Sequence, residues 1–137
     1  MHLDLRTPLF YTKSAVSDVD VPPLFPENDE FLFCFNLNPA QCRSIEPVRE
    51  QFLGDFLFSG VKTAGSKADQ SVSLPAGEYL FVQSRGKSPM NREEWLDLAV
   101  EQQKDGLWER HQLGDMLYIR FLYEDGAVVT QLFRTKK

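Results

Sequence analysis

Arg120 is the side chain best suited to hold a ligand, because it is a cation inside an apolar segment that runs over 116–123. A guanidinium binds a carboxylate or a phosphate through two parallel hydrogen bonds, and it stacks on flat rings. A charged side chain gains nothing from strand propensity in such a segment. We therefore expect Arg120 to be solvated, to pair with an acid from another strand, or to bind an anionic or aromatic small molecule.

The neighbours of Arg120 follow from the dipeptide Asp125-Gly126, which is typical of a two-residue type I′ turn between antiparallel strands. Such a turn joins strands over 116–124 and 127–134 and fixes the register between them. One face of this hairpin is then almost wholly apolar, and we expect it to pack under helices.

The other face of the hairpin combines aromatic and polar side chains, which are Tyr118, Arg120, Gln131 and Phe133. An apolar wall with few polar groups is typical of a small-molecule site, and the alternative is a solvated sheet face with a cross-strand Arg–Gln contact. Tyr79, on a strand predicted over 78–83, extends this site if it faces the same side. The alternative is that Tyr79 belongs to the core, because both faces of that strand are apolar.

No other group of residues has the pattern of a catalytic or metal site. Cys34 lies in an apolar run and is interpreted as a buried small hydrophobe, whereas a catalytic thiol needs a histidine or a positive neighbourhood. The two histidines have no partner at metal-ligand spacing. We therefore name no catalytic residue, no metal and no cofactor. For a hydrolase, the nearest groups are Glu124 and Tyr118.

The composition is that of one globular domain over 1–137, with 42% hydrophobic residues, a net charge of −5 and a pI near 5.0. Direct binding to nucleic acid is not expected, because phosphate binding needs a basic surface. The longest apolar run, 31–35, is far too short to span a bilayer, and no secretion signal opens the chain. We therefore expect a cytoplasmic protein with no membrane partner.

The hydrophobic pattern predicts strands separated by two helices. The strands are expected over 9–11, 30–37, 56–58, 78–83, 116–124 and 127–134. The first helix is expected over about 44–54. The second opens near 88–91, carries Trp95, Leu98 and Gln102 on its apolar side, and ends at Gly106.

The strands also indicate an internal repeat. Two pairs of segments resemble each other: 30–33 with 78–81, and 54–58 with 114–118. A helix lies between the members of each pair, so each copy, 30–74 and 78–134, is strand-helix-strand-strand; chance similarity is the alternative. Two such units predict an α+β fold, with one antiparallel sheet, two helices on one face, and an open groove on the other.

The segment 74–82 (Leu-Pro-Ala-Gly-Glu-Tyr-Leu-Phe-Val), followed by Gly86 and by a helix with Trp95-Leu96, resembles the second half of GyrI-like effector-binding domains. Such domains are also found fused to AraC-type and MerR-type regulators. The resemblance covers about 74–133, and the first half of the chain in architecture only. It implies duplicated units around a ligand groove. The family often has a glutamate in a late aromatic strand, where this chain has Arg120, so cation binding is not carried over.

These observations predict a non-enzymatic domain that binds a small molecule and acts as a sensor or a sequestering module. The alternative is a protein-interaction or inhibitor module that uses its acidic surface. The resemblance also allows this role, because the family includes a gyrase inhibitor. A small hydrolase is the third hypothesis, since some relatives act on small electrophiles.

Overall fold

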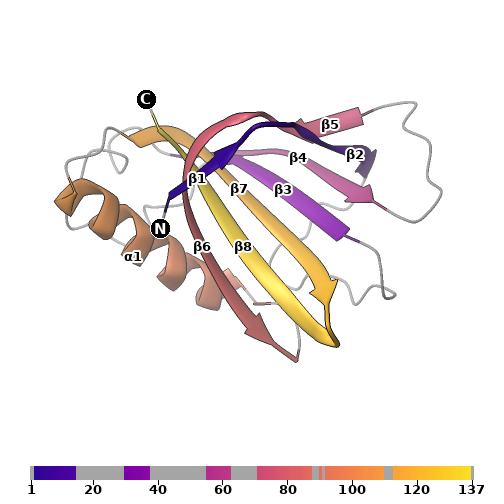
Figure 1. Cartoon of the computed structure of the whole chain (residues 1–137). Coiled ribbons are helices and arrows are strands. Elements are labelled where there is room, and N and C mark those ends of the chain that lie inside the picture. Colours follow the sequence, from indigo (N-terminus) through magenta and orange to yellow (C-terminus); the bar gives the residue numbers. More distant parts are fainter. Residues whose placement is uncertain are drawn as a thin grey trace.

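The computed structural model describes residues 2–14, 30–37, 55–62, 71–87, 90, 92–109 and 113–136, which form one antiparallel sheet and one helix (Figure 1). The helix α1 spans Arg92–Trp108. The strands are β1 (His2–Leu5), β2 (Leu9–Ser14), β3 (Glu30–Asn36), β4 (Asp55–Lys62), β5 (Ser71–Leu74), β6 (Gly77–Gly86), β7 (Leu113–Glu124) and β8 (Ala127–Lys136). Their order across the sheet is β1-β6-β8-β7-β3-β4-β2-β5.

The β7–β8 hairpin has the predicted turn and register. Asp125 and Gly126 have φ angles of 52° and 77°, and a type I′ turn requires positive φ at both central positions. Asp tolerates this conformation and glycine adopts it without steric cost. Arg120 lies opposite Gln131, as the turn predicts. The sequence of the turn therefore decides which side chains share a face with Arg120.

The sheet is rolled, because two short connections join strands from its opposite ends: 6–8 between β1 and β2, and 75–76 between β5 and β6. β5 lies at one end of the sheet and β6 next to the other, yet only Pro75 and Ala76 separate them. In a flat sheet, six strand spacings would put β5 and β6 ~29 Å apart. Three Cα–Cα steps reach at most ~11 Å. Figure 1 shows the long, curved β6 continuing from β5 across the top of the sheet.

The inner face of the rolled sheet encloses one cluster of buried side chains, which are Tyr11, Leu32, Cys34, Leu74, Tyr79, Tyr118 and Phe133. They come from both ends of the sheet as well as from its middle, so the roll brings them together. Leu3 and Leu5 of β1 pack against this cluster. The face that was predicted to form an open groove is therefore covered by the sheet itself.

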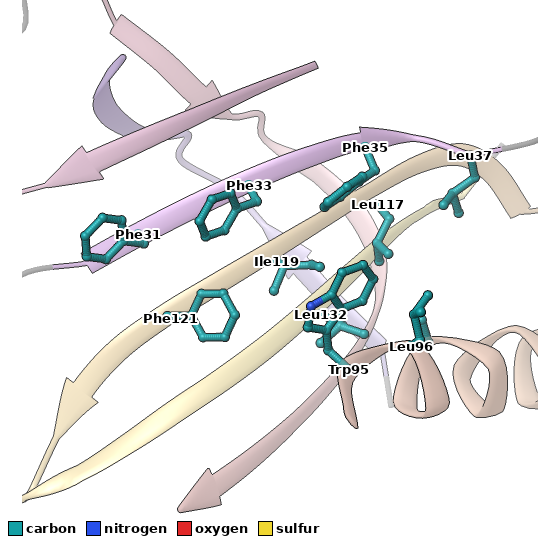
Figure 2. Close-up of a cluster of buried hydrophobic side chains, with 11 residues drawn as sticks. Phe31, Phe33, Phe35, Leu37, Trp95, Leu96, Leu117, Ile119, Phe121 and Leu132 are labelled. Carbon is teal, nitrogen blue, oxygen red and sulfur yellow. The ribbon is translucent and has the colours of Figure 1, made fainter. Parts of the chain in front are cut away.

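The helix α1 packs on the outer face of the sheet, which is the apolar face predicted for the hairpin. Figure 2 shows Trp95 and Leu96 of α1 against side chains of the central strands, which are Phe31, Phe33, Phe35, Leu117, Ile119, Phe121 and Leu132. Trp95 is 1% exposed, and its ring centroid lies 5.3 Å from that of Phe35. Leu98 is only partly buried against this cluster.

The predicted fold class is wrong, because the two halves of the chain do not pair alike. β3 and β4 are direct neighbours, whereas the matching strands β6 and β7 are separated by β8. β2, which precedes both predicted copies, lies between β4 and β5. The part of the chain that the structure describes contains one helix, not two on one face. The first predicted helix, 44–54, lies outside the described residues.

Other local expectations meet mixed outcomes. Strands β1 and β5 were not predicted, and α1 continues past Gly106 to Trp108. Gly106 packs so closely on Leu80 and Leu113 that a side chain there would displace them. Within the described ranges, no helix is both long enough and apolar enough to cross a membrane.

Candidate functional site

The residues predicted to form a ligand site do come together on the inner face of the sheet. Tyr79 shares this face with Tyr118 and Phe133, and its ring centroid lies 6.1 Å and 5.7 Å from theirs. Both alternatives for Tyr79 therefore hold in part, since it shares that face and is also buried core. Gln131 is buried beside Arg120, to which it is hydrogen-bonded. No member of this group lines either of the two cavities described below.

Arg120 is held by an ion pair with Glu30, at the start of β3. Its Nη2 donates to Glu30 Oε2 over 2.9 Å, and its Nε donates to the same oxygen over 3.2 Å. The two side chains are 16% and 17% exposed, so water screens the pair only partly. Of the three environments expected for Arg120, the structure shows the pairing with an acid from another strand.

Tyr11 and Gln131 complete a polar network around the Arg120–Glu30 pair. Tyr11 Oη accepts from Arg120 Nε over 2.9 Å and donates to Glu30 Oε2 over 2.9 Å. Gln131 Oε1 accepts from Arg120 Nη1 over 3.1 Å, and Gln131 Nε2 donates to Gln83 Oε1 over 3.1 Å. The network connects β2, β3, β7, β8 and β6, so it ties the rolled sheet together across five strands.

The network keeps Arg120 charged and leaves it already occupied. Burial lowers the pKa of Arg120, but Tyr11 and Glu30 outweigh burial and raise the pKa above its ordinary value. An anionic ligand would therefore have to displace the Glu30 carboxylate rather than fill an open position. The ligand role of Arg120 stays a prediction from the sequence.

Cys34 lies among the aromatic rings of the inner cluster as a free, fully buried thiol. Burial raises the pKa of Cys34 to about 12. The thiolate is the nucleophilic form of cysteine, so a thiol with this pKa is unreactive at neutral pH. The interpretation of Cys34 as a buried hydrophobe is confirmed, and Cys42 lies outside the described residues.

We expect the protein to lose stability as the pH rises above 10. Burial raises the pKa of Tyr11, Tyr79 and Tyr118, in the case of Tyr79 to about 12. In the unfolded chain these phenols ionise near pH 10. The stabilisation is therefore complete below pH 10 and is lost as the pH rises through the folded pKa values. Urea unfolding at pH 9 and pH 11, with absorbance at 295 nm for tyrosinate, checks this result. Ionisation of Tyr11, Tyr79 and Tyr118 near pH 10 in a protein that stays folded would contradict it.

A cavity of about 250 Å³ lies between α1 and β6. Its lining residues are Leu80, Phe81, Val82, Leu98, Glu101, Gln102, Asp105, Gly106 and Glu109. β1 pairs only with residues 77–80 of β6, so the outer edge of β6 from Phe81 onward has no strand partner among the described residues. The cavity, called the α1–β6 cavity below, lies where this edge meets the helix.

Gln102 is the buried polar residue of the α1–β6 cavity. It is 6% exposed, and its Nε2 donates to Leu80 O and Leu132 O, each over 3.1 Å. Its Oε1 is also buried, and no group in the described part of the chain donates to it. An unpaired buried acceptor costs about 1–3 kcal/mol. Such groups are uncommon in folded proteins, and Asn36 Oδ1 is another one in the described part of the chain.

Acidic side chains line one side of the same cavity. Glu101 and Asp105 lie on α1, and Glu109 directly follows its last residue, so the three acids are spaced four residues apart. Glu109 accepts from His2 Nε2 over 3.0 Å, and His2 Nδ1 lies 2.7 Å from Lys136 Nζ. Since a lysine ammonium can only donate, Nδ1 accepts and Nε2 carries the proton given to Glu109. This chain of contacts ties the end of α1 to β1 and β8.

A second hollow, of about 240 Å³, lies near the start of α1 beside the β6–β8 edge. Arg85 and Lys87 line it together with Glu94. Arg85 already pairs with Glu124, at 3.5 Å, and donates to the Glu124 carbonyl oxygen over 3.1 Å. The walls carry both signs of charge, so this hollow favours no ligand class.

The sequence contained one signal for the α1–β6 cavity, which was the position of Gln102 on the apolar side of the predicted helix. A polar residue in an apolar stripe needs a buried partner. Its partners are backbone carbonyls of β6 and β8, which no sequence pattern identifies. The sequence also does not show that β6 lies beside the acids Glu101 and Asp105.

No known protein-family model matches this chain, and no curated protein matches it. The resemblance to GyrI-like domains therefore stays a prediction from the sequence.

Proposed function

We propose that this chain is a non-enzymatic domain that binds a small molecule in the α1–β6 cavity, as a sensor or a sequestering module of the cytoplasm. The proposal is carried by the cavity itself, which combines an apolar wall with one buried amide and three acidic side chains. That make-up is typical of small-molecule sites, and a volume of about 250 Å³ fits a ligand smaller than a drug-sized one.

The location of the site differs from the one expected from the sequence. Leu80, Val82 and Leu98 form an apolar wall with room beside it. Tyr118 and Phe133, by contrast, are buried in the inner cluster and already packed against other rings. The α1–β6 cavity has space for a ligand as it stands. Binding at Arg120 would require the loss of the pair with Glu30.

A binding role is also supported by the positions of the groups that a hydrolase would need. Glu124 and Tyr118 lie six residues apart on β7, which corresponds to ~20 Å along a strand. Two groups at that distance cannot act on the same atom. The free Cys34 thiol is buried and its pKa is raised, so it stays protonated and is not a nucleophile at neutral pH. A free thiol also fits the reducing cytoplasm.

A ligand screen by thermal unfolding tests the proposal, with Leu98→Trp as the variant that fills the cavity. A ligand at 100 times its Kd should stabilise the native protein by about 2.7 kcal/mol. The shift should be lost in Leu98→Trp, because the indole occupies the space beside β6.

Val100→Trp is the matched control for this screen. Val100 is another partly buried residue of α1, and it does not line the cavity. It packs on the outer-face cluster, which is the group of buried side chains between α1 and the outer face of the sheet. Both variants are first compared by circular dichroism to show that they fold. A ligand that stabilises Leu98→Trp as much as the parent would bind elsewhere and would remove the cavity from the proposal.

A further inference from the structure

The outer edge of β6 has no strand partner over residues 81–86 in the described part of the chain, because β1 pairs only with residues 77–80. Figure 1 shows β1 beside the upper part of β6 only. Gln83, Arg85 and Gly86 are exposed, so this part of the strand faces water. An edge of this kind presents a row of backbone N–H and C=O groups that can pair with a further strand. Residues 81–86 are called the free edge of β6 below.

The free edge of β6 lacks the features that usually protect a strand edge. The end strands of the sheet, β1 and β5, are only four residues long, and Pro75 directly follows β5. Short strands and prolines are two of the devices that keep sheet edges from pairing. Residues 81–86 contain no proline, and their pairing with β8 has no bulge. The free edge is therefore regular enough to extend the sheet by another strand.

The geometry of the free edge allows it to pair with a second copy of itself. In an antiparallel pair, residues directly opposite each other have their side chains on the same face. A strand paired with its own copy across a two-fold axis is therefore centred on one residue, which lies opposite itself. A pair centred on Gln83 would put Gly86 of the copy opposite Leu80, where His2 of β1 already lies. Centring the pair on Ser84 avoids this overlap.

The distribution of charge along the free edge also favours a second copy. The edge begins at the α1–β6 cavity, whose lining includes the exposed Glu101 and Asp105, and Lys87 directly follows its other end. In an antiparallel pair, the basic end of each copy lies at the acidic end of the other, and two-fold symmetry repeats this attraction. Arg85, the one charged residue within the edge, lies opposite Gln83 in the pair centred on Ser84. Like charges are therefore not placed opposite each other.

We propose that two copies of this chain associate through the free edges of β6, so that their sheets form one continuous antiparallel sheet across a two-fold axis. The second copy then brings its Lys87 next to each α1–β6 cavity. The dimer does not need a ligand, so its test and the thermal screen have independent outcomes.

Sedimentation over a range of protein concentrations measures this association. The mass should rise from 15.8 kDa to twice that value as the concentration increases. Ser84→Lys places two ammonium groups directly opposite each other, so it should raise the Kd of the dimer by at least about tenfold. Ser73→Lys is the matched control, because Ser73 is also a partly buried serine of a strand, but lies on β5. It should keep the parental Kd, and circular dichroism shows whether both variants fold.

Cross-linking tests the register without adding a charge. Both variants carry Cys42→Ser, which leaves the buried Cys34 as the only natural thiol. Under mild oxidation Ser84→Cys should form a covalent dimer, because the Cβ atoms of opposite residues are about 4.5–5.5 Å apart, close to the span of a disulfide. Gln83→Cys is the control on the same strand. Its copy lies diagonally across the pair, about 7–8 Å away, so it should cross-link much more slowly.

A mass of 15.8 kDa at every concentration would overturn the proposal, and would leave the free edge to an extended segment of another protein. Association that is lost in Ser73→Lys but kept in Ser84→Lys would place the contact at β5 and would also overturn it. If Ser84→Lys does not fold, the cysteine variants decide. Any result other than faster covalent dimerisation of Ser84→Cys than of Gln83→Cys contradicts the pairing of the two β6 strands.

Discussion

Trp95→Ala should lower the free energy of unfolding by about 3–5 kcal/mol, the usual cost of removing a fully buried tryptophan. The side chain is 1% exposed and joins α1 to the outer-face cluster, where it packs on Phe35. Figure 2 shows it between the helix and the strands. A domain of this size is stabilised by about 5–15 kcal/mol in total. Urea unfolding followed by circular dichroism measures the change.

Trp108 provides the control for this experiment, because it belongs to the same helix and is 79% exposed. Trp108→Ala should change the stability by no more than about 0.5 kcal/mol. The chain has two tryptophans, so each variant also leaves one fluorophore. The remaining Trp95 should emit at short wavelength and resist quenching by acrylamide, whereas Trp108 should be quenched freely. Equal losses of stability in the two variants would mean that α1 does not pack as described.

The parts of the fold that depend on nearby residues could be predicted from the sequence. The turn at Asp125-Gly126 fixes its own backbone angles and therefore the register of β7 and β8. The spacing of Trp95, Leu98 and Gln102 predicts the packed side of α1 in the same way, because helical periodicity is a local property. Trp95 and Gln102 are buried, and Leu98 is partly buried. Each of these predictions needs only a segment of about twenty residues.

The arrangement of the sheet could not be predicted, because it depends on pairs that are distant in the sequence. The four residues of β5 have too weak a pattern to indicate a strand, and their partner β2 lies about sixty residues earlier. The similarity of 30–33 to 78–81 reflects aromatic strands that pack on the same sheet, not equivalent places in a repeat. With β5 missed, nothing in the sequence indicated that the sheet closes over its inner face.

The candidate site shows the same limit. The Arg–Gln contact on the hairpin was predictable from the turn, but Glu30 is 90 positions from Arg120. An acid at the start of a strand has no feature that marks it as the partner of one particular arginine. The position of Glu30 therefore decides whether Arg120 serves the fold or a ligand.

Arg120→Ala should accordingly reduce stability, by about 2–4 kcal/mol. Removing one partner of a fully buried ion pair costs about 3–5 kcal/mol, because the other charge is left uncompensated. The Arg120–Glu30 pair is about one-sixth exposed, so the remaining carboxylate recovers part of its hydration and the expected loss is smaller. Tyr11 and Gln131 also lose hydrogen bonds to the guanidinium. Urea unfolding at neutral pH measures the loss.

Arg85→Ala is the matched control. Arg85, on β6, pairs with Glu124 of β7, but both side chains are nearly half exposed. Exposed pairs contribute about 0–1 kcal/mol, so this variant should stay close to the parent. The double variant Arg120→Ala/Glu30→Ala also removes the carboxylate that Arg120→Ala alone leaves without its partner. The combined loss should therefore be smaller than the sum of the two single losses. A parental stability for Arg120→Ala would show instead that the guanidinium does not hold the rolled sheet together, which is the result that a ligand-binding role for Arg120 predicts.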